Sequence, residues 1–231
     1  MNAEQDAQQF RRAGMTLAGA ARMFARYPSP RVLVPATATV LAARAVLGRW
    51  SRRDVKIAAA MVALEPFVEW MVHVHVLHQR PRSIRGRTYD SALARKHRKH
   101  HESPREPELV FIPKERLGAI VAGLAVTNAA VFRRNPRAAL TGTAATLALL
   151  TTYEWTHFLI HSSYKPKSGL YRAVRRTHQL HHFRNEKYWF GIITPVSDKV
   201  LNTDPPKNDV PPSPTVKTLG IVDEQPEAVG A

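Results

Sequence analysis

The sequence of 231 residues contains no cysteine. Without cysteine the chain can form no disulfide framework, no thiolate zinc site and no iron–sulfur cluster, and it has no cysteine nucleophile. Any metal chemistry must therefore rest on other side chains. The length predicts one ordinary domain, long enough to bury a core or to form a few membrane spans with a cap.

Acidic residues are also scarce, with 18 aspartates and glutamates against 34 lysines and arginines, which gives a formal net charge of +16. Such an excess usually favours nucleic acid or an anionic membrane surface as a partner. The arginines are scattered among apolar stretches, and no RNP, zinc-finger or helix-turn-helix signature accompanies them. We therefore expect no nucleic-acid partner.

The sequence has no long hydrophobic run that is free of charge. Four apolar stretches approach the roughly 20 residues that a helix needs to cross a bilayer. They cover residues 32–48, 55–77, 117–132 and 138–160. Charged residues interrupt three of the four, namely Arg44, Lys56, Glu65, Glu69 and Glu154, and the remaining stretch, 117–132, is only 16 residues long. Hydropathy alone leaves a soluble helical bundle open.

The arrangement of these stretches favours a membrane, because short turns at 49–54 and 133–137 join them into two helical hairpins. If the N-terminus is cytosolic, both hairpins return to the cytosol, and most lysines and arginines lie on that side. We predict an all-α integral membrane fold with four spans, with both termini and a helical cap of histidine clusters on the cytosolic side. We expect residues 1–31 to form a cytosolic or interfacial segment, residues 32–203 the membrane domain, and the proline-rich residues 204–231 a disordered tail.

The most prominent feature of the sequence is a histidine pattern that occurs twice. All 11 histidines lie between His73 and His182, and each copy has a Glu-Trp pair, two spaced histidines and an HxxHH cluster. The repeated positions are His73, His78, His97, His100 and His101 in the first copy and His157, His161, His178, His181 and His182 in the second. Imidazole binds iron, zinc, copper or nickel, and one ion does not need ten of them. The pattern predicts a dimetal site, with His75 as a surplus residue because it has no counterpart in the second copy.

Helical spacing can bring these ligands together. Residues at i, i+3 and i+4 share a helix face, so we expect the three histidines of each HxxHH cluster to point to one place. His157 and His161 are one turn apart, whereas His73 and His78 diverge by about 140° on an ideal helix. That divergence is easier to use at a fraying helix end, or with metals on both sides of a cleft.

Three acidic residues accompany the histidines. Glu154 and His157 form the ExxH half-motif of di-iron carboxylate bundles, but the further glutamates and the second ExxH motif of such a bundle are missing. We predict instead that Glu69, Glu154 and Asp198 accept hydrogen bonds from the free N–H groups of ligating imidazoles, or that the two glutamates face a polar pocket.

These motifs resemble those of the fatty acid hydroxylase and sterol desaturase superfamily of membrane histidine-box oxygenases. The resemblance covers roughly residues 55–203, and its HxxxH third box looks most like that of fatty acid 2-hydroxylases. The matching stretches are VEWMVHVHVLH (68–78), HRKHH (97–101), EWTHFLIH (154–161) and HQLHHFRNEKYWFGIITPVSDKVLNT (178–203).

The resemblance implies a non-haem site of two iron ions, which zinc can replace on overexpression, that uses O2 to hydroxylate a C–H bond of a lipid such as a fatty acyl chain. It also implies a separate electron donor, such as a cytochrome b5-like, ferredoxin-like or rubredoxin-like carrier, because no cytochrome b5 domain is fused to the sequence. A basic cytosolic face suits an acidic redox partner. Tyr188, Trp189 and Phe190 are expected either to line the substrate entry near the interface or to anchor the chain there.

Two alternatives stay open. A sterol or lipid desaturase or a carotenoid hydroxylase would use the same scaffold. A membrane zinc protein, either a hydrolase or a metal-binding scaffold, would use the same histidines. Activity that requires O2 and a reductant distinguishes the oxygenases from the zinc protein.

Overall fold

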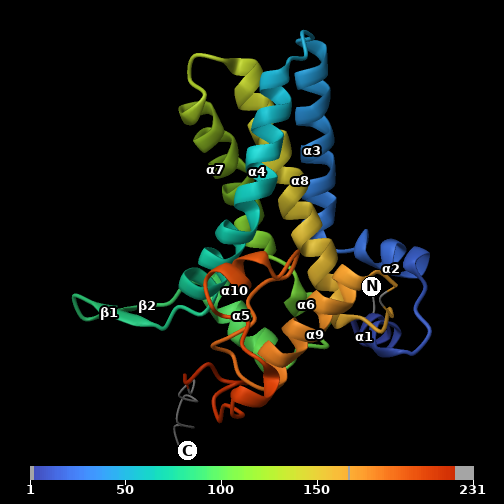
Figure 1. Cartoon of the computed structure of the whole chain (residues 1–231), viewed down its shortest axis with the longest axis vertical. Coiled ribbons are helices and arrows are strands. Elements are labelled where there is room, and N and C mark those ends of the chain that lie inside the picture. The colour runs from blue at the N-terminus through green and yellow to red at the C-terminus, as the bar shows by residue number, and fades with distance from the viewer. Residues whose placement is uncertain (1–2, 166, 222–231) are drawn as a thin grey trace, which may run out of the picture.

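The computed structural model describes residues 3–165 and 167–221, which form a helical stalk standing on a helical cap (Figure 1). The stalk consists of two helical hairpins. Helices α3 (Pro28–Val46) and α4 (Arg52–Val72) form the first, and α7 (Lys114–Val131) and α8 (Pro136–His161) form the second. The two hairpins expected from the apolar stretches are therefore present.

Helix α8 is the centre of the stalk, because it packs against α3, α4 and α7. Small residues allow this close packing. At Gly142 an added Cβ atom would lie 2.2 Å from Asn128 Oδ1 and 3.0 Å from the ring of Phe132. Glycine at this position thus lets α7 approach the backbone of α8.

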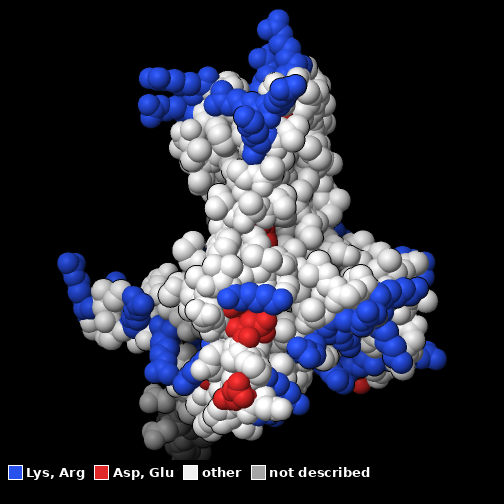
Figure 2. All heavy atoms as spheres, viewed as in Figure 1, with Lys and Arg blue, Asp and Glu red and all other residues white. Residues whose placement is uncertain are grey.

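The outside of the stalk is apolar. Figure 2 shows a largely uncharged band between lysines and arginines at the tip and the charged cap. Among the described helices, one continuous segment, Arg52–Leu77, is long and apolar enough to cross a membrane, and only 22% of its apolar window is buried inside the molecule. These features indicate a membrane protein with one candidate span, whereas the four-span topology stays a prediction.

The cap surrounds the lower end of α8. Its helices are α1 (Ala3–Arg11), α2 (Leu17–Phe24), α5 (Ala92–Glu102), α6 (Pro107–Val110), α9 (Gly169–Phe183) and α10 (Val196–Val200). An aromatic core holds the N-terminal helices in place. The rings of Phe10 and Phe158 have centroids 5.1 Å apart, and Tyr27 stacks on Phe111 at 4.5 Å. The described part of the N-terminal segment is thus integral to the cap.

The structure is mostly helical, as expected, and the described residues add one small hairpin that the sequence did not predict. Strands β1 (Arg82–Ile84) and β2 (Arg87–Tyr89) form an antiparallel hairpin beside the cap (Figure 1). Its two turn residues have positive φ angles, 51° at Arg85 and 74° at Gly86. A two-residue turn of this kind matches the twist of paired strands, which explains why this short segment is not helical.

The proline-rich tail also differs from the expectation of disorder, because residues 204–221 are placed along the cap and include the short 3-10 helix η2 (Lys207–Asp209). Proline cannot donate a backbone hydrogen bond, but carbonyl groups in the segment still accept. The Nε atom of Arg184 donates to the Val210 carbonyl at 2.7 Å, and Asn185 donates to the Pro211 carbonyl at 3.2 Å. The expectation for residues 222–231 lies outside the described residues.

A buried ion pair joins three stalk helices near the turn between α3 and α4. Arg44 is 0% exposed, and its guanidinium donates to Asp54 Oδ1 at 2.8 Å and 3.1 Å. Thr141 of α8 donates to the same oxygen at 2.6 Å. The arginine that interrupts the first apolar stretch is thus neutralised inside the stalk.

We expect Arg44→Gln to lower the free energy of unfolding by about 3–5 kcal/mol, because it leaves the buried Asp54 carboxylate without its counter-charge. The matched control is Arg26→Gln. The Arg26 side chain is 45% exposed and pairs with Asp6 at 3.3 Å, and such pairs contribute about 1 kcal/mol or less. Denaturant unfolding of the purified protein measures both variants, and equal losses would contradict the role of the buried pair.

Candidate metal centre

The ten repeated histidines meet where the stalk joins the cap. They come from the π-helical turn η1 (His73–Leu77) that follows α4 and the residue after it, from α5, from the last two turns of α8, and from α9. His78 and His161 are half-buried, and the other eight are buried. His75 is exposed and has its ring edge-on to Trp70, with centroids 5.9 Å apart, so it lies outside the cluster.

The ten rings form two sets of five, and within each set the candidate ligand nitrogens lie within 4.8 Å of one another. The first set is His73, His78, His97, His101 and His181. The second set is His100, His157, His161, His178 and His182. This grouping agrees with a dimetal site, and ligation of metal by these residues stays a prediction.

The HxxHH clusters do not each point to one place, which differs from the expectation based on helical spacing. In both clusters the outer two histidines join the set of their own copy, while the middle one, His100 or His181, joins the other set. Helix geometry explains the division, because residues i and i+4 are about 40° apart around the axis and i+3 lies about 100° from i+4. Helices α5 and α9 therefore each supply histidines to both sets.

The π-helical turn explains how His73 and His78, five residues apart, lie on the same side of the chain. The backbone N–H of His78 donates to the His73 carbonyl at 3.1 Å, a hydrogen bond between residues five apart. Such a turn is wider than an α-helical turn, so two residues five apart come to the same face, and these turns are frequent at functional sites. The ring centroids of His73 and His78 are 5.0 Å apart.

Backbone carbonyls fix the orientation of four of the rings. A carbonyl oxygen can only accept, so each bonded Nδ1 carries the proton and the Nε2 of that ring is left with a free lone pair. The four pairs are His73 with Phe190 at 2.8 Å, His101 with Val216 at 2.9 Å, His157 with Val110 at 3.0 Å and His181 with Tyr188 at 2.7 Å.

The inward-facing nitrogens crowd one another in a way that fits a bound cation. Nε2 of His161 lies 3.1 Å from that of His100, 3.1 Å from that of His157 and 2.9 Å from that of His178. A single proton cannot serve three such contacts. Two ligands at right angles on an ion with bonds of about 2.1 Å lie about 3.0 Å apart.

The first set fits a cation for a second reason. The Nε2 atoms of His78, His101 and His181 are buried without any hydrogen-bond partner in the described residues. Buried polar atoms are rarely left unpaired in folded proteins, and coordination of an ion satisfies such an atom. Because all ten donors are imidazole nitrogens, they fit iron or zinc and do not fit magnesium or calcium.

Burial keeps the rings on the cap helices in the neutral form that a metal requires. It lowers the pKa of His101 to about 3, and lowers the pKa of His97, His100 and His178 well below the usual value. The same holds for the pKa of His181 and His182. Proton competition for these ligands is therefore expected only in acid.

The two glutamates act on the backbone, which corrects the expectation that they bind the imidazoles directly. Glu69 accepts hydrogen bonds from the N–H groups of Ile192 and Ile193, in the loop whose Phe190 carbonyl holds His73. Glu154 accepts from the Ile112 N–H at 2.7 Å, and the nearby Val110 carbonyl holds His157. The two copies of the sequence pattern thus share this arrangement, in which a glutamate holds the backbone near the carbonyl that binds a histidine.

Asp198 also holds that loop and not an imidazole. Its carboxylate accepts from the N–H groups of Phe190 at 3.0 Å and Gly191 at 2.7 Å, and from the Thr203 hydroxyl at 2.6 Å. A Cβ atom at position 191 would lie 2.4 Å from the Thr194 carbonyl oxygen. Gly191, Asp198 and Thr203, in the stretch that follows the last histidine box, therefore support the Phe190 carbonyl.

The aromatic run after the last box is only partly as expected. Phe190 packs edge-on against His73, His78 and His181 and lines a cavity of about 580 Å³ next to His78. Trp189 is 1% exposed, and its indole donates to the Pro205 carbonyl, so it anchors the tail and does not line an entry. Tyr188 contributes its carbonyl to His181.

Sequence reasoning missed the carbonyl groups of Val110 and Val216. Both act through backbone atoms, so no residue type marks them. Val216 lies in the segment that composition had predicted to be disordered, yet it holds His101 in place.

We expect the purified protein to carry about two metal ions per folded chain, because each set offers five ligands and an ion takes four to six. His73→Ala should lower the metal content, whereas His75→Ala, two residues away, should leave it unchanged. Elemental analysis measures the content. One ion or none in the unmodified protein, or an equal loss in both variants, would contradict the two-set assignment.

Comparisons with known proteins agree with this geometry. The profile of the family described as fatty acid hydroxylase matches residues 58–203. The dihydroceramide fatty acyl 2-hydroxylase FAH2 of Arabidopsis thaliana is 26% identical over 177 residues, which are 76% of this chain and 72% of the relative. A solved structure of full-length scs7p, in which only the hydroxylase domain is visible, has a TM-score of 0.66 at 19% identity, covering 80% of this chain and 68% of that one. That structural likeness shows the fold alone. Because the family profile spans more than half of the sequence and includes both histidine sets, the chain belongs to the fatty acid hydroxylase family.

Proposed function

We propose that the protein is an O2-dependent, non-haem di-iron enzyme that hydroxylates a C–H bond of a lipid acyl chain. The observation that carries the proposal is the pair of five-imidazole sets at the foot of an apolar stalk. When bound there, two iron ions would supply the activation of O2, which is the hard part of the chemistry. The name of the Arabidopsis relative supports an acyl substrate.

The reaction converts R–H and O2 into R–OH and water, and it needs two electrons and two protons from outside the chain. The protein has to hold ten ligands, orient the acyl chain and keep bulk water away. Burial of the rings serves the last task. The carbonyls of Phe190 and Val110 serve the first, because they fix His73 and His157 with Nε2 facing inward.

A small cavity marks where we propose that the reacting carbon lies. It has a volume of about 40 Å³ and touches one ring of each set, His97 and His157. Its wall includes Leu77 at the foot of α4, as well as Leu93, Leu109 and Tyr153. The wall is mainly apolar, with Lys96 as the one charged residue among the described residues that line it. Such a wall beside both sets suits a methylene group that arrives along the stalk, and the volume is close to that of one small group.

We also propose the four-span topology, with the cap and both termini in the cytosol. Its support is the uncharged band around the stalk and the exposure of large apolar side chains on three of the stalk helices, such as Val34, Val62 and Val126. Soluble proteins rarely expose a continuous apolar surface of this extent. Basic residues lie on the cap, as the positive-inside rule expects for a cytosolic face.

We expect membranes that contain the protein to convert an acyl lipid into a product heavier by one oxygen atom, and only with O2 and a reductant. Lipid mass spectrometry with and without the protein measures this. His178→Ala should abolish the product and His75→Ala should keep most of it. A loss of two hydrogen atoms would indicate a desaturase instead, and turnover without O2 by a zinc-loaded protein would overturn the oxygenase.

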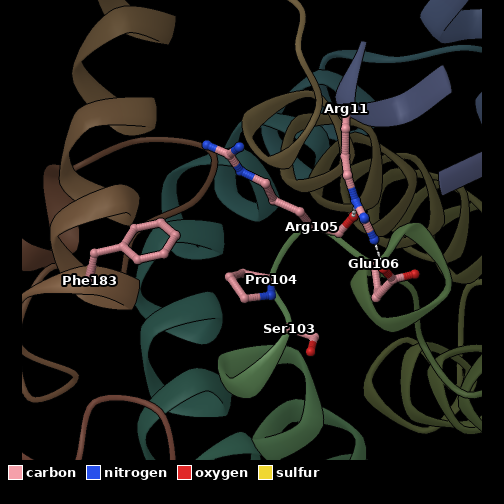
Figure 3. A pocket seen from close by; sticks show the side chains of 6 residues that line it. All are labelled: Arg11, Ser103, Pro104, Arg105, Glu106 and Phe183. Carbon is pink, nitrogen blue, oxygen red and sulfur yellow. Dashed lines mark hydrogen bonds and ion pairs between the residues drawn. The ribbon is translucent and has the colours of Figure 1, made fainter. Parts of the chain in front are cut away.

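For the electrons we propose a separate acidic carrier that docks beside Phe183. This ring is 58% exposed and follows the ligand candidate His182, with ring centroids 6.3 Å apart. Arg105, Pro104 and Phe183 lie around an open hollow of about 450 Å³, together with the paired side chains of Arg11 and Glu106 (Figure 3). Electron carriers dock through small, charge-steered interfaces, and a basic rim favours an acidic one.

We expect Arg105→Glu to raise the KM for an acidic carrier such as cytochrome b5 or ferredoxin by about tenfold, because steering between opposite charges is lost. Turnover with a chemical reductant should not change. Arg134→Glu, in the turn between α7 and α8 at the far end of the stalk, is the matched control. Steady-state kinetics at two ionic strengths measures both, and an equal effect of the two variants would contradict docking at Phe183.

A further inference from the structure

The β1–β2 hairpin is unused by the proposed chemistry. It projects sideways near the foot of the stalk, and all six of its strand residues are exposed (Figure 1). An isolated two-stranded hairpin is marginally stable in water. Its turn nevertheless has the backbone geometry that matches strand twist, with positive φ at Arg85 and Gly86. The hairpin is therefore a preformed arm whose faces lack a cover in the described structure.

The strand register gives the arm two different faces. Arg82 pairs with Tyr89, Ser83 with Thr88, and Ile84 with Arg87. Paired residues of antiparallel strands point to the same side, and neighbours along a strand alternate. One face therefore carries Arg82, Ile84, Arg87 and Tyr89, and the other carries only Ser83 and Thr88. Ile84 and Tyr89, diagonal neighbours on the first face, are 56% and 57% exposed.

The charges of the arm have one sign. Residues 79–89 contain basic side chains, all of them arginines, and no acid. The next residue, Asp90, forms an ion pair with Arg98 of α5, so it does not neutralise the arm. A surface that carries arginine, tyrosine and isoleucine together has the chemistry of the lipid headgroup region, where basic groups meet anionic lipids and tyrosine rings settle at the boundary.

The position of the arm favours a membrane over an acidic protein as its cover. The candidate span ends at Leu77, and β1 begins five residues later. A chain of that length reaches at most about 17 Å. The arm thus starts close to the plane in which the span would leave the bilayer.

We propose that the face formed by Arg82, Ile84, Arg87 and Tyr89 lies on the membrane surface and binds the headgroups of anionic phospholipids. The arm would then fix the depth and tilt of the cap beneath the stalk. This inference rests on the proposed membrane topology, and the experiment must separate the two.

The absence of cysteine makes a direct test possible, because a single introduced cysteine is the only site that a thiol-reactive fluorophore can label. Ile84→Cys reports on the proposed lipid face, and Thr88→Cys on the opposite face is the matched control. Val62→Cys, on the exposed apolar side of α4, reports on the stalk. The full chain is reconstituted in vesicles of phosphatidylcholine, with or without phosphatidylglycerol, that contain a lipid-borne quencher.

We expect the Ile84→Cys label to be quenched from the lipid, more strongly with phosphatidylglycerol, and the Thr88→Cys label to be quenched mainly by aqueous acrylamide. One arginine near an anionic surface strengthens binding about fivefold, so Arg82→Gln with Arg87→Gln should weaken binding of the arm to anionic lipid by about 25-fold. Equal quenching at positions 84 and 88, or no dependence on phosphatidylglycerol, would contradict the proposal that the arm binds anionic lipid. If the label at position 62 is quenched from the lipid and the label at position 84 is not, the stalk spans the membrane but the arm does not bind it. If the label at position 62 is not quenched from the lipid, the proposed topology is wrong, and the proposal for the arm, which rests on it, is wrong too.

Discussion

The mutual repulsion of buried nitrogen atoms is the constraint on which the rest of the structure depends. Nε2 of His161 lies within 3.1 Å of three other Nε2 atoms, and because one proton cannot serve all three contacts, free lone pairs there repel unless a cation lies between them. The rings must be held there by other means. Backbone carbonyls hold the Nδ1 side of four rings, His157 next to His161 among them, and the carboxylates of Glu69, Glu154 and Asp198 hold the chain that carries two of those carbonyls. The acidic residues thus position the rings indirectly, through the backbone.

Much of the site could be predicted from the sequence, because the information lies in residue identity and helical spacing. The repeated order set His75 apart from the other ten histidines, and the structure places it outside both sets. The two stalk hairpins could be predicted because apolar length and short turns act locally. The number of membrane spans could not be fixed in this way, since charges such as Arg44 lower the hydropathy of a helix even where a partner neutralises them inside the fold.

The rest could not be predicted because it depends on backbone geometry. A π-helical turn brings His73 and His78 together, and no residue pattern predicts such a turn. The angles of an α-helix divide each HxxHH cluster between two directions, but which set each direction meets depends on the packing of α5 and α9, which is a tertiary property. Disorder was predicted for the tail because it is rich in proline, but composition does not show where its carbonyl groups bind, and one of them accepts a hydrogen bond from His101.

The bridging role of α5 and α9 links the two halves of the centre. His100 and His101 are neighbours in sequence but belong to different sets, as are His181 and His182. A rotation of either helix that improved one set would spoil the other, so the two sets cannot adjust independently. With two ions bound as we propose, filling one set would preorganise the other, and the affinities for the two ions would be coupled in both directions. The protein would thus pass between empty and doubly loaded forms, with the half-loaded form as a minor species.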